Sequence, residues 1–123
     1  NGSVTIINTK NFEIIKTISF SVKGIKSQDI TPVDFAYSKK LEKVFVTLGS
    51  ANHVAVVNTK SHDVENNILV GSRVWGAALT RNDKELIVTN GNSDDISVID
   101  LKKLVAISSI PVGKTPHTVR VLK

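Results

Sequence analysis

The sequence predicts an all-β fold of short antiparallel strands grouped in sheets of four, and two observations support it. The first is an internal repeat. Residues 44–71 (VFVTLGSANHVAVVNTKSHDVENNILVG) align without gaps with residues 86–113 (LIVTNGNSDDISVIDLKKLVAISSIPVG), at a constant offset of 42 residues. The second is that each repeat unit holds four short runs rich in Val, Ile and Leu, separated by clusters of Gly, Asn, Asp, Ser and Lys. Such runs are typical of strands joined by hairpins.

The repeat extends to both ends of the chain and divides it into four parts. These parts are residues 1–20, which match the second half of a unit, residues 33–70 and 75–112, which each match a whole unit, and residues 117–123, which match the first strand of a further unit. The joint at residues 21–32 is longer than the corresponding joint between the two whole units. One loop between repeats is therefore expected to carry an insertion.

The third strand of each whole unit indicates how the sheets pack. Residues 54–58 (VAVVN) and 96–100 (ISVID) are almost continuously apolar, as expected when neighbouring sheets cover both faces of a strand. Four strands in a unit of about 40 to 45 residues are typical of a β-propeller blade, in which twisted sheets pack face to face around an axis. The sequence therefore predicts a β-propeller.

Two features of the strand nearest the axis refine this prediction. Ala36 and Ala78 occupy equivalent places in it, and small residues suit a crowded axis, but Arg120 falls at that place in the last strand. Either that strand frays or Arg120 faces a wet central channel. The predicted strands number about eleven, under three blades, whereas propellers typically have about four to eight blades. We therefore expect the remaining blades to come from further residues of this protein or from other chains.

The sequence also resembles a known family. Residues 85–119 (ELIVTNGNSDDISVIDLKKLVAISSIPVGKTPHTV) resemble the YVTN-type β-propeller repeat, with its YVTN strand, VSVID strand and IPVG segment. Residues 74–100 are most similar to bacterial propellers associated with pyrroloquinoline-quinone-dependent catabolism of alcohols. The resemblance implies a periplasmic or secreted protein of that metabolism. The usual SPDGK turn of the family reads SKKLEK and TRNDKE here, without its glycine.

Composition excludes several classes of function. The chain is 41% hydrophobic and 22% charged, and it has no cysteine, which excludes disulfides, thiolate metal sites and a cysteine nucleophile. No segment approaches the roughly 18 consecutive apolar residues that a membrane span requires. The formal charge of +5 comes without clusters of aromatic and basic residues, so no nucleic-acid partner is predicted.

A candidate ligand site consists of Arg73, Trp75 and His117. The repeat places Trp75 and His117 at equivalent starts of first strands, beside the mouth of the ring. Tryptophan stacks on flat ligands, arginine grips carboxylates through paired hydrogen bonds, and histidine titrates near neutrality, so the set suits a small anionic ligand such as a quinone carboxylate. The alternative is that Trp75 packs between blades and that His117 merely follows a proline in a joint. No cofactor is identified by these residues.

Other polar clusters have simpler explanations. Residues 90–95 (NGNSDD) are rich in oxygen ligands, but Asn, Asp and Gly are also the residues that tight turns require. His53, His62 and His117 lie in different turns, and no catalytic or metal-binding set is predicted. The basic residues of the opposite face are interpreted as a solvated rim; they are Lys39, Lys40, Lys60, Arg81, Lys84, Lys102 and Lys103.

These observations favour a non-enzymatic propeller that acts as a scaffold or as a ligand- or partner-binding accessory in periplasmic redox metabolism. The inserted joint, with Lys23, Lys26 and Asp29, is its most distinctive predicted contact. Two alternatives remain: a redox enzyme subunit with a quinone or haem cofactor over the mouth of the propeller, and a cell-surface adhesion protein. The predicted partner is a protein or a small anionic ligand.

Overall fold

A computed structural model describes residues 2–122, and in these residues the chain is all-β. Ten strands and one short 3-10 helix follow one another along the chain. They are β1 (Ser3–Ile7), β2 (Ile14–Ser19), η1 (Ser27–Asp29), β3 (Phe35–Ser38), β4 (Lys43–Thr47), β5 (His53–Asn58), β6 (Val64–Leu69), β7 (Val74–Leu79), β8 (Glu85–Asn90), β9 (Asp95–Asp100) and β10 (Val105–Pro111). The predicted fold class is confirmed.

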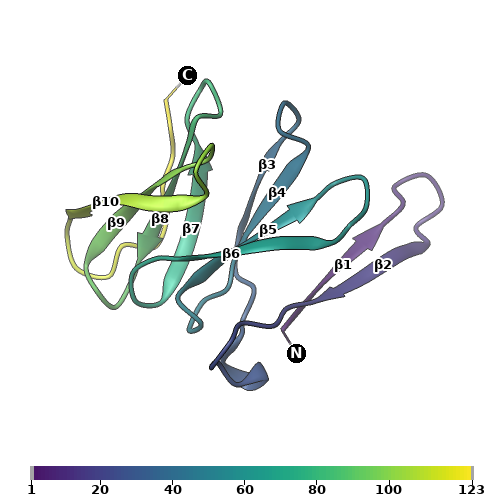
Figure 1. Cartoon of the computed structure of the whole chain (residues 1–123), viewed down its shortest axis with the longest axis horizontal. Coiled ribbons are helices and arrows are strands. Elements are labelled where there is room, and N and C mark those ends of the chain that lie inside the picture. The colour runs from purple at the N-terminus through teal and green to yellow at the C-terminus, as the bar shows by residue number, and fades with distance from the viewer. Residues whose placement is uncertain (1, 123) are drawn as a thin grey trace.

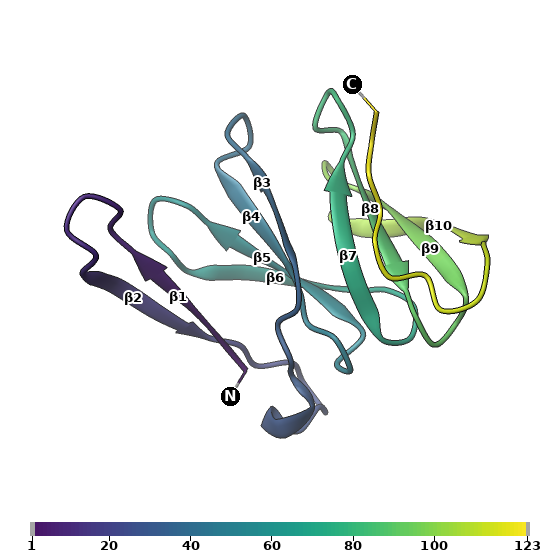
Figure 2. The same ribbon diagram turned by 180° about the vertical axis from the view of Figure 1, so that it is seen from behind.

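The strands form three antiparallel sheets in chain order (Figures 1 and 2). Strands β3 to β6 form one four-stranded sheet, called the middle blade here, and β7 to β10 form a second, called the C-terminal blade. Strands β1 and β2 pair only with each other and are called the half-blade. Each sheet is a simple meander, because every strand pairs with its neighbour in sequence.

The three sheets repeat their backbone details as well as their strand order. The turn between the last two strands of each sheet has one residue in the left-handed region: Phe12 at φ 59°, His62 at φ 61° and Leu104 at φ 54°. A register shift follows Ile6 in β1 and Val56 in β5, at the same place of the repeat. The half-blade therefore corresponds to the third and fourth strands of a blade.

Two apolar cores fill the spaces between the sheets. The core between the middle and C-terminal blades contains Ala36, Phe45, Val54, Val56, Ile68, Val74, Ala77, Leu86, Val88, Ile99 and Leu101. The core between the half-blade and the middle blade contains Ile18, Phe20, Val22, Ile30, Val46, Leu48, Ala51, Ala55 and Val57. Residues of β5 enter both cores, so both faces of this apolar strand are covered, as its sequence predicts.

Residues 117–122 differ from the prediction, because they form no strand. The segment runs beside β7 in Figure 2, and the carbonyl oxygen of His117 lies close to Gly76. Arg81 donates from Nε to the Leu122 carbonyl over 3.2 Å, and Arg120 is exposed. A strand requires a ladder of hydrogen bonds to a second strand, and no strand of residues 2–122 forms such a ladder with this segment. The segment thus occupies the place of a first strand without its pairing.

Helices contribute little to the described chain. The single helix, η1, has three residues. Across residues 2–122 no helix is long and apolar enough to cross a membrane.

Candidate functional site

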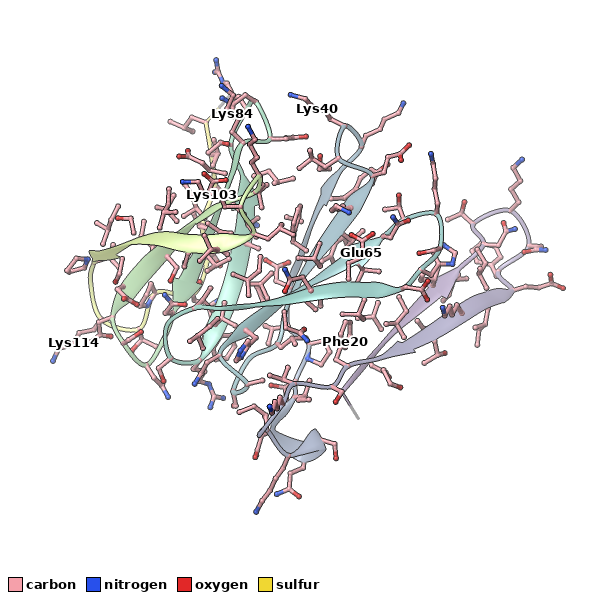
Figure 3. The ribbon with its side chains drawn as sticks, viewed as in Figure 1. Phe20, Lys40, Glu65, Lys84, Lys103 and Lys114 are labelled. Atoms are coloured by element: carbon pink, nitrogen blue, oxygen red, sulfur yellow. The ribbon has the colours of Figure 1, made fainter. Side chains whose placement is uncertain are left out.

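The loops of the three sheets lie at two ends of the molecule. Lys40 and Lys84 mark the tips of the β3–β4 and β7–β8 hairpins at one end, and Lys114 lies at the other end (Figure 3). The second end, called the joint end here, carries the connections between sheets and the turns between second and third strands. It contains residues 21–32, 49–52, 71–73, 91–94 and 112–117.

The joint between the two blades has a fixed backbone. Arg73 lies in the left-handed region at φ 55°, and its backbone N–H donates to Oδ1 of Asn52 over 2.7 Å. The Arg73 carbonyl accepts from the backbone N–H of Gly91 over 2.9 Å. Asn52 belongs to a turn of the middle blade and Gly91 to a turn of the C-terminal blade. These bonds hold the backbone of Arg73 between turns of two blades and so fix the point from which its side chain extends.

The structure brings the three candidate residues together. The guanidinium carbon of Arg73 lies over the Trp75 ring, 5.2 Å from its centroid. The rings of Trp75 and His117 are 4.4 Å apart between centroids and tilted by 41°. A cation placed over an aromatic face is attracted by the ring's electron density. Arg73, Trp75 and His117 thus form one continuous cluster from two successive joints.

Two buried threonines position the backbone of this cluster. Oγ1 of Thr47 donates to the Trp75 carbonyl over 2.7 Å, and Oγ1 of Thr89 donates to the His117 carbonyl over 3.0 Å. Each hydroxyl also accepts a backbone N–H at the start of its own sheet, from Asp34, just before β3, over 3.0 Å and from Gly76 of β7 over 2.9 Å. The threonines are equivalent in the repeat. Sequence reasoning missed them, although the repeated Val-Thr pair of the second strand was a visible signal.

Trp75 packs within the cluster and against Gly91. A Cβ atom added to Gly91 would lie 2.6 Å from Nε1 of Trp75, so only glycine leaves room for the indole here. Nε1 is buried and has no hydrogen-bond partner among residues 2–122. Trp75 belongs to neither apolar core. The indole is therefore a packed side chain, as in the alternative interpretation. It packs, however, against residues of the joint end.

The chemistry available at the cluster is that of a cationic, partly aromatic surface. Arg73 and His117 are exposed, and Trp75 is half-buried between them. A flat anion could pair with the guanidinium and contact the ring edges, but it could stack on the face below Arg73 only by displacing that side chain. Cavities lie between the half-blade and the middle blade, between β6 and β10, and beside the β7–β8 hairpin, and these cavities are lined by none of the three residues.

The carboxylates of the oxygen-rich turn at residues 90–95 accept hydrogen bonds, whereas the buried Oδ1 of Asn90 has no partner among residues 2–122. Asp95 accepts from Nδ2 of Asn90 over 2.9 Å, from Oγ of Ser93 over 2.7 Å, and from Ser109. Burial raises the pKa of Asp95, but the hydrogen bonds from Ser109, Ser93 and Asn90 together outweigh it and leave the pKa below the usual 3.8. Asp94 accepts the backbone N–H of Thr115 over 2.8 Å. Both carboxylates are thus engaged by hydrogen bonds, Asp95 within the C-terminal blade and Asp94 with the joint that follows it.

The inserted joint at residues 21–32 is anchored by apolar side chains. Val22 and Ile30 are buried in the core beside the half-blade, and Ile25 packs against that core. Thr31 donates its N–H to the Leu48 carbonyl over 3.2 Å. Lys23, Lys26 and Asp29 are exposed around η1. The insertion therefore presents charged side chains from a fixed base at the joint end.

The histidines do not come together. His53 places Nδ1 2.6 Å from the Ala51 carbonyl, and His62 lies in the β5–β6 turn at the opposite end from His117. Within residues 2–122 no group of three or more His, Cys, Asp or Glu side chains could hold a metal ion.

Comparison with known proteins establishes the fold. No family model and no curated protein match this sequence. Among solved structures, hydrazine synthase from Kuenenia stuttgartiensis is 25% identical with a TM-score of 0.71, over 80% of this chain and 29% of that chain. AztD from Citrobacter koseri is 12% identical with a TM-score of 0.70, over 95% of this chain and 31% of that one. Both are β-propeller proteins. The chain folds as a partial β-propeller.

A third similar structure agrees with this conclusion. A functionally unknown protein from Desulfotomaculum acetoxidans is 16% identical with a TM-score of 0.78, over 98% of this chain and 38% of that one. The partial propeller thus spans about a third of the length of the proteins it resembles. At these identities the fold is shared, and the activities of those proteins are their own.

Proposed function

We propose that this partial propeller belongs to a non-enzymatic binding protein, which uses its joint end to hold a small anionic ligand or a protein partner. One observation carries the proposal: side chains from two successive joints converge in the cluster of Arg73, Trp75 and His117. The inserted joint adds the exposed charges of Lys23 and Lys26 at the same end. Binding residues on loops held by a rigid scaffold are a common arrangement.

The chemistry of the cluster favours an acidic, flat ligand. Arginine offers parallel hydrogen-bond donors that match a carboxylate, and the indole and imidazole rings add apolar area. The resemblance of the repeat to YVTN-type propellers associated with pyrroloquinoline-quinone-dependent catabolism extends the proposal. It suggests a periplasmic or secreted accessory protein whose ligand is a carboxylated quinone or a related acid.

A redox enzyme subunit is the second candidate function. It is favoured by the similarity to hydrazine synthase, which has the highest identity of the three structures described above. In that case a cofactor would be held by residues outside this segment. Protein purified with a bound chromophore would favour this candidate over the binding protein.

Fluorescence titration tests the proposed site directly, because Trp75 is the only tryptophan of the sequence. Pyrroloquinoline quinone is the probe, and an uncharged quinone of similar size is its control. Binding of the acid should change the Trp75 emission, and Arg73→Ala should weaken it about tenfold or more, as expected for loss of hydrogen bonds to a charged group. The Lys102→Ala/Lys103→Ala variant changes the opposite face and should bind like the wild type.

Two outcomes would count against the site. Loss of binding only in the lysine variant would place the ligand on the opposite face. If no acid binds to any variant, the small-ligand proposal fails and the protein partner is tested next, by comparing capture of partners by the wild type and by Lys23→Glu/Lys26→Glu. Equal capture of partners by the wild type and the variant would show that the joint end does not bind them.

A further inference from the structure

An open groove lies between the outer strands of the two blades, in the space called the second space here. Strands β6 and β10 are edge strands of the middle and C-terminal blades, and a cavity of about 780 Å³ lies between them. Both blades have all four strands, so the groove is not the place of a missing strand. Its apolar lining includes Val70, Leu104 and Ala106, and its polar lining includes Asp95, Ser97 and Ser109.

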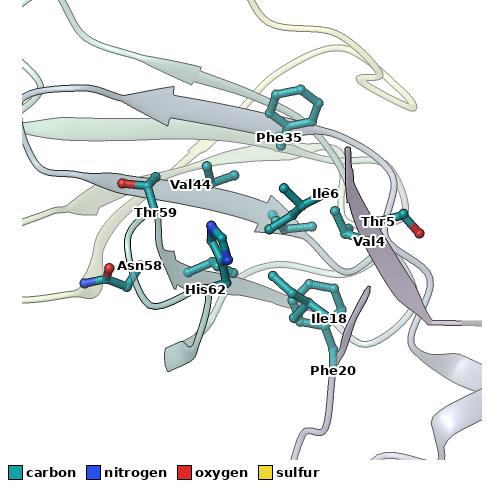
Figure 4. Close-up of a pocket in the computed structure, with 12 residues that line it drawn as sticks. Val4, Thr5, Ile6, Ile18, Phe20, Phe35, Val44, Asn58, Thr59 and His62 are labelled. Atoms are coloured by element: carbon teal, nitrogen blue, oxygen red, sulfur yellow. The ribbon is translucent and has the colours of Figure 1, made fainter. Parts of the chain in front are cut away.

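The corresponding edge of the space between the half-blade and the middle blade, called the first space here, is closed by polar contacts. Asn67 of β6 donates from Nδ2 to the Ser21 carbonyl over 3.1 Å. Lys16 of β2 forms an ion pair with Asp63 over 3.3 Å. These contacts join the outer parts of the two sheets. The cavity that remains in the first space is smaller, about 320 Å³, and it is lined by Phe35, which is 65% exposed (Figure 4).

The residues at the same repeat positions leave the second space open. Ser109 is equivalent to Asn67, but its hydroxyl donates to Asp95 of its own sheet and not to the neighbouring blade. Asn66 and Val105 are at the positions of the lysine and the aspartate that form the ion pair of the first space, and they carry no charges. The groove therefore results from side chains that do not bridge the blades.

Polar residues also replace apolar ones inside the second space. Asn90 and Ser97 are at the positions that Leu48 and Ala55 occupy in the apolar core of the first space. Asn90 is fully buried, and its Nδ2 donates to Asp95 and to Ser97, in both cases over 2.9 Å. A buried amide costs free energy unless its groups are paired, and Oδ1 of Asn90 has no partner among residues 2–122. Packing alone therefore does not explain this polar set.

Asp95 brings a negative charge to the groove. Burial raises its pKa, but the hydrogen bonds from Ser109, Ser93 and Asn90 hold the pKa below 3.8, so the carboxylate is charged at neutral pH. All three donors are uncharged, and no lysine or arginine among residues 2–122 forms an ion pair with Asp95. The groove therefore complements a positive charge.

The lining favours an organic cation over a metal ion. Calcium takes roughly six to eight oxygen ligands, whereas one carboxylate and two hydroxyls line this groove. An ammonium group has three donors and no acceptor, and the oxygen atoms of Asp95, Ser97 and Ser109 can accept them. The apolar wall can cover an alkyl chain, because burial of apolar surface is favourable.

We infer that the groove between β6 and β10 binds a small aliphatic amine. The ammonium group donates to Asp95 and to the serine hydroxyls, and the alkyl chain lies along Val70 and Leu104. The groove has no lining residue in common with the cluster of Arg73, Trp75 and His117, and it selects the opposite charge. This inference therefore stands or falls independently of the proposed function.

Hexylamine is the probe, and 1-hexanol, with the same alkyl chain and no charge, is its control. Each is titrated into the full chain while NMR follows the backbone amides of residues 68–71 and 104–109. Hexylamine should shift these amides saturably, and the alcohol should bind about tenfold more weakly or less, as expected for loss of a hydrogen bond to a charged group. Asp95→Asn should weaken amine binding by the same factor. Asp94→Asn removes an equal charge from the neighbouring residue, which does not line the groove, and should bind like the wild type.

A second variant tests the apolar wall and leaves the carboxylate in place. Val70 is equivalent to Phe20 of the half-blade, which is buried in the first space. Val70→Phe should fill the groove and abolish the saturable shifts. It keeps the test decisive if Asp95→Asn proves unstable, and circular dichroism shows which variants are folded.

Four outcomes would overturn the inference. Hexylamine may give no saturable shift up to its solubility limit, or 1-hexanol may bind as tightly as the amine. Asp94→Asn may weaken binding as much as Asp95→Asn, which would show a general effect of charge. Folded Val70→Phe may bind like the wild type, which would place the amine outside the groove.

Discussion

The middle and C-terminal blades have the same sequence repeat, yet their third strands differ in burial. Strand β5 has four consecutive buried residues, Val54 to Val57, whereas β9 buries only Ser97 and Ile99. The middle blade lies between two sheets, and the C-terminal blade has a sheet on one side only in the described chain. An apolar run therefore allows a strand to be buried on both faces, and the neighbouring sheets determine how many of its residues are buried.

The largest expected difference between the blades concerns Phe45 and its equivalent Ile87. Phe45 is fully buried between the two blades, and Ile87 is half-buried on the side without a further sheet. Phe45→Ala should lower the free energy of unfolding by about 3–5 kcal/mol, because it removes apolar contacts and leaves a cavity. Ile87→Ala should cost less than half as much. Urea unfolding of both variants measures the difference, and equal losses would contradict this account of burial.

A smaller difference is expected between the two positioning threonines. Thr47→Val should cost about 1–3 kcal/mol, because it leaves the Asp34 N–H and the Trp75 carbonyl without their partner. Thr89→Val should cost less, because the carbonyl that it releases belongs to a segment without strand pairing. Thermal unfolding compares the two variants, and a larger loss for Thr89→Val would show that residues 117–122 are held more firmly than their contacts indicate.

The next smaller difference between the blades concerns the pH dependence of their contributions to stability. At equivalent places the C-terminal blade has Asp95 in a hydrogen-bond network and the middle blade has His53. The pKa of Asp95 is lowered in the folded protein, so its contribution is present above the unfolded value near 3.8 and is lost as the pH falls through the folded value.

The stability difference between the wild type and Asp95→Asn should therefore be largest near neutral pH and should shrink in acid. Urea unfolding between pH 7 and pH 2.5 gives this difference directly. Because other carboxylates titrate equally in both proteins, subtraction isolates Asp95. A difference that grows in acid would contradict the lowered pKa.

The smallest expected effect concerns an ion pair that only the middle blade has. Lys43 of β4 contacts Glu65 of β6, and the equivalent residues of the C-terminal blade are Glu85 and Ile107, which form no such pair. Both partners are partly exposed, so Lys43→Ala should change stability by at most about 1 kcal/mol, and less at high salt. Melting temperatures at low and high salt suffice, and a large salt-independent loss would mean that the lysine acts through packing.

The sequence by itself determined the repeat, the strands and their order. Hydrophobic runs and turn residues are local properties, so the alignment of residues 44–71 with residues 86–113 carried over to two four-stranded sheets. It also placed Trp75 and His117 at equivalent positions, from which their proximity follows once the blades are adjacent. Arg73 was named from its chemistry, and its binding role stays a prediction.

Only the tertiary structure decided which faces are covered and which polar groups meet. The sequence of residues 117–123 reads as a strand, but a strand forms only where a second strand supplies hydrogen bonds, and residues 117–122 lack one. Thr47 and Thr89 could not be assigned in advance, because the carbonyl groups to which they donate, those of Trp75 and His117, lie beyond their own sheets. The exposure of Phe35 likewise depends on the sheet beside it, since burial is a property of neighbours in space and not of the residue alone.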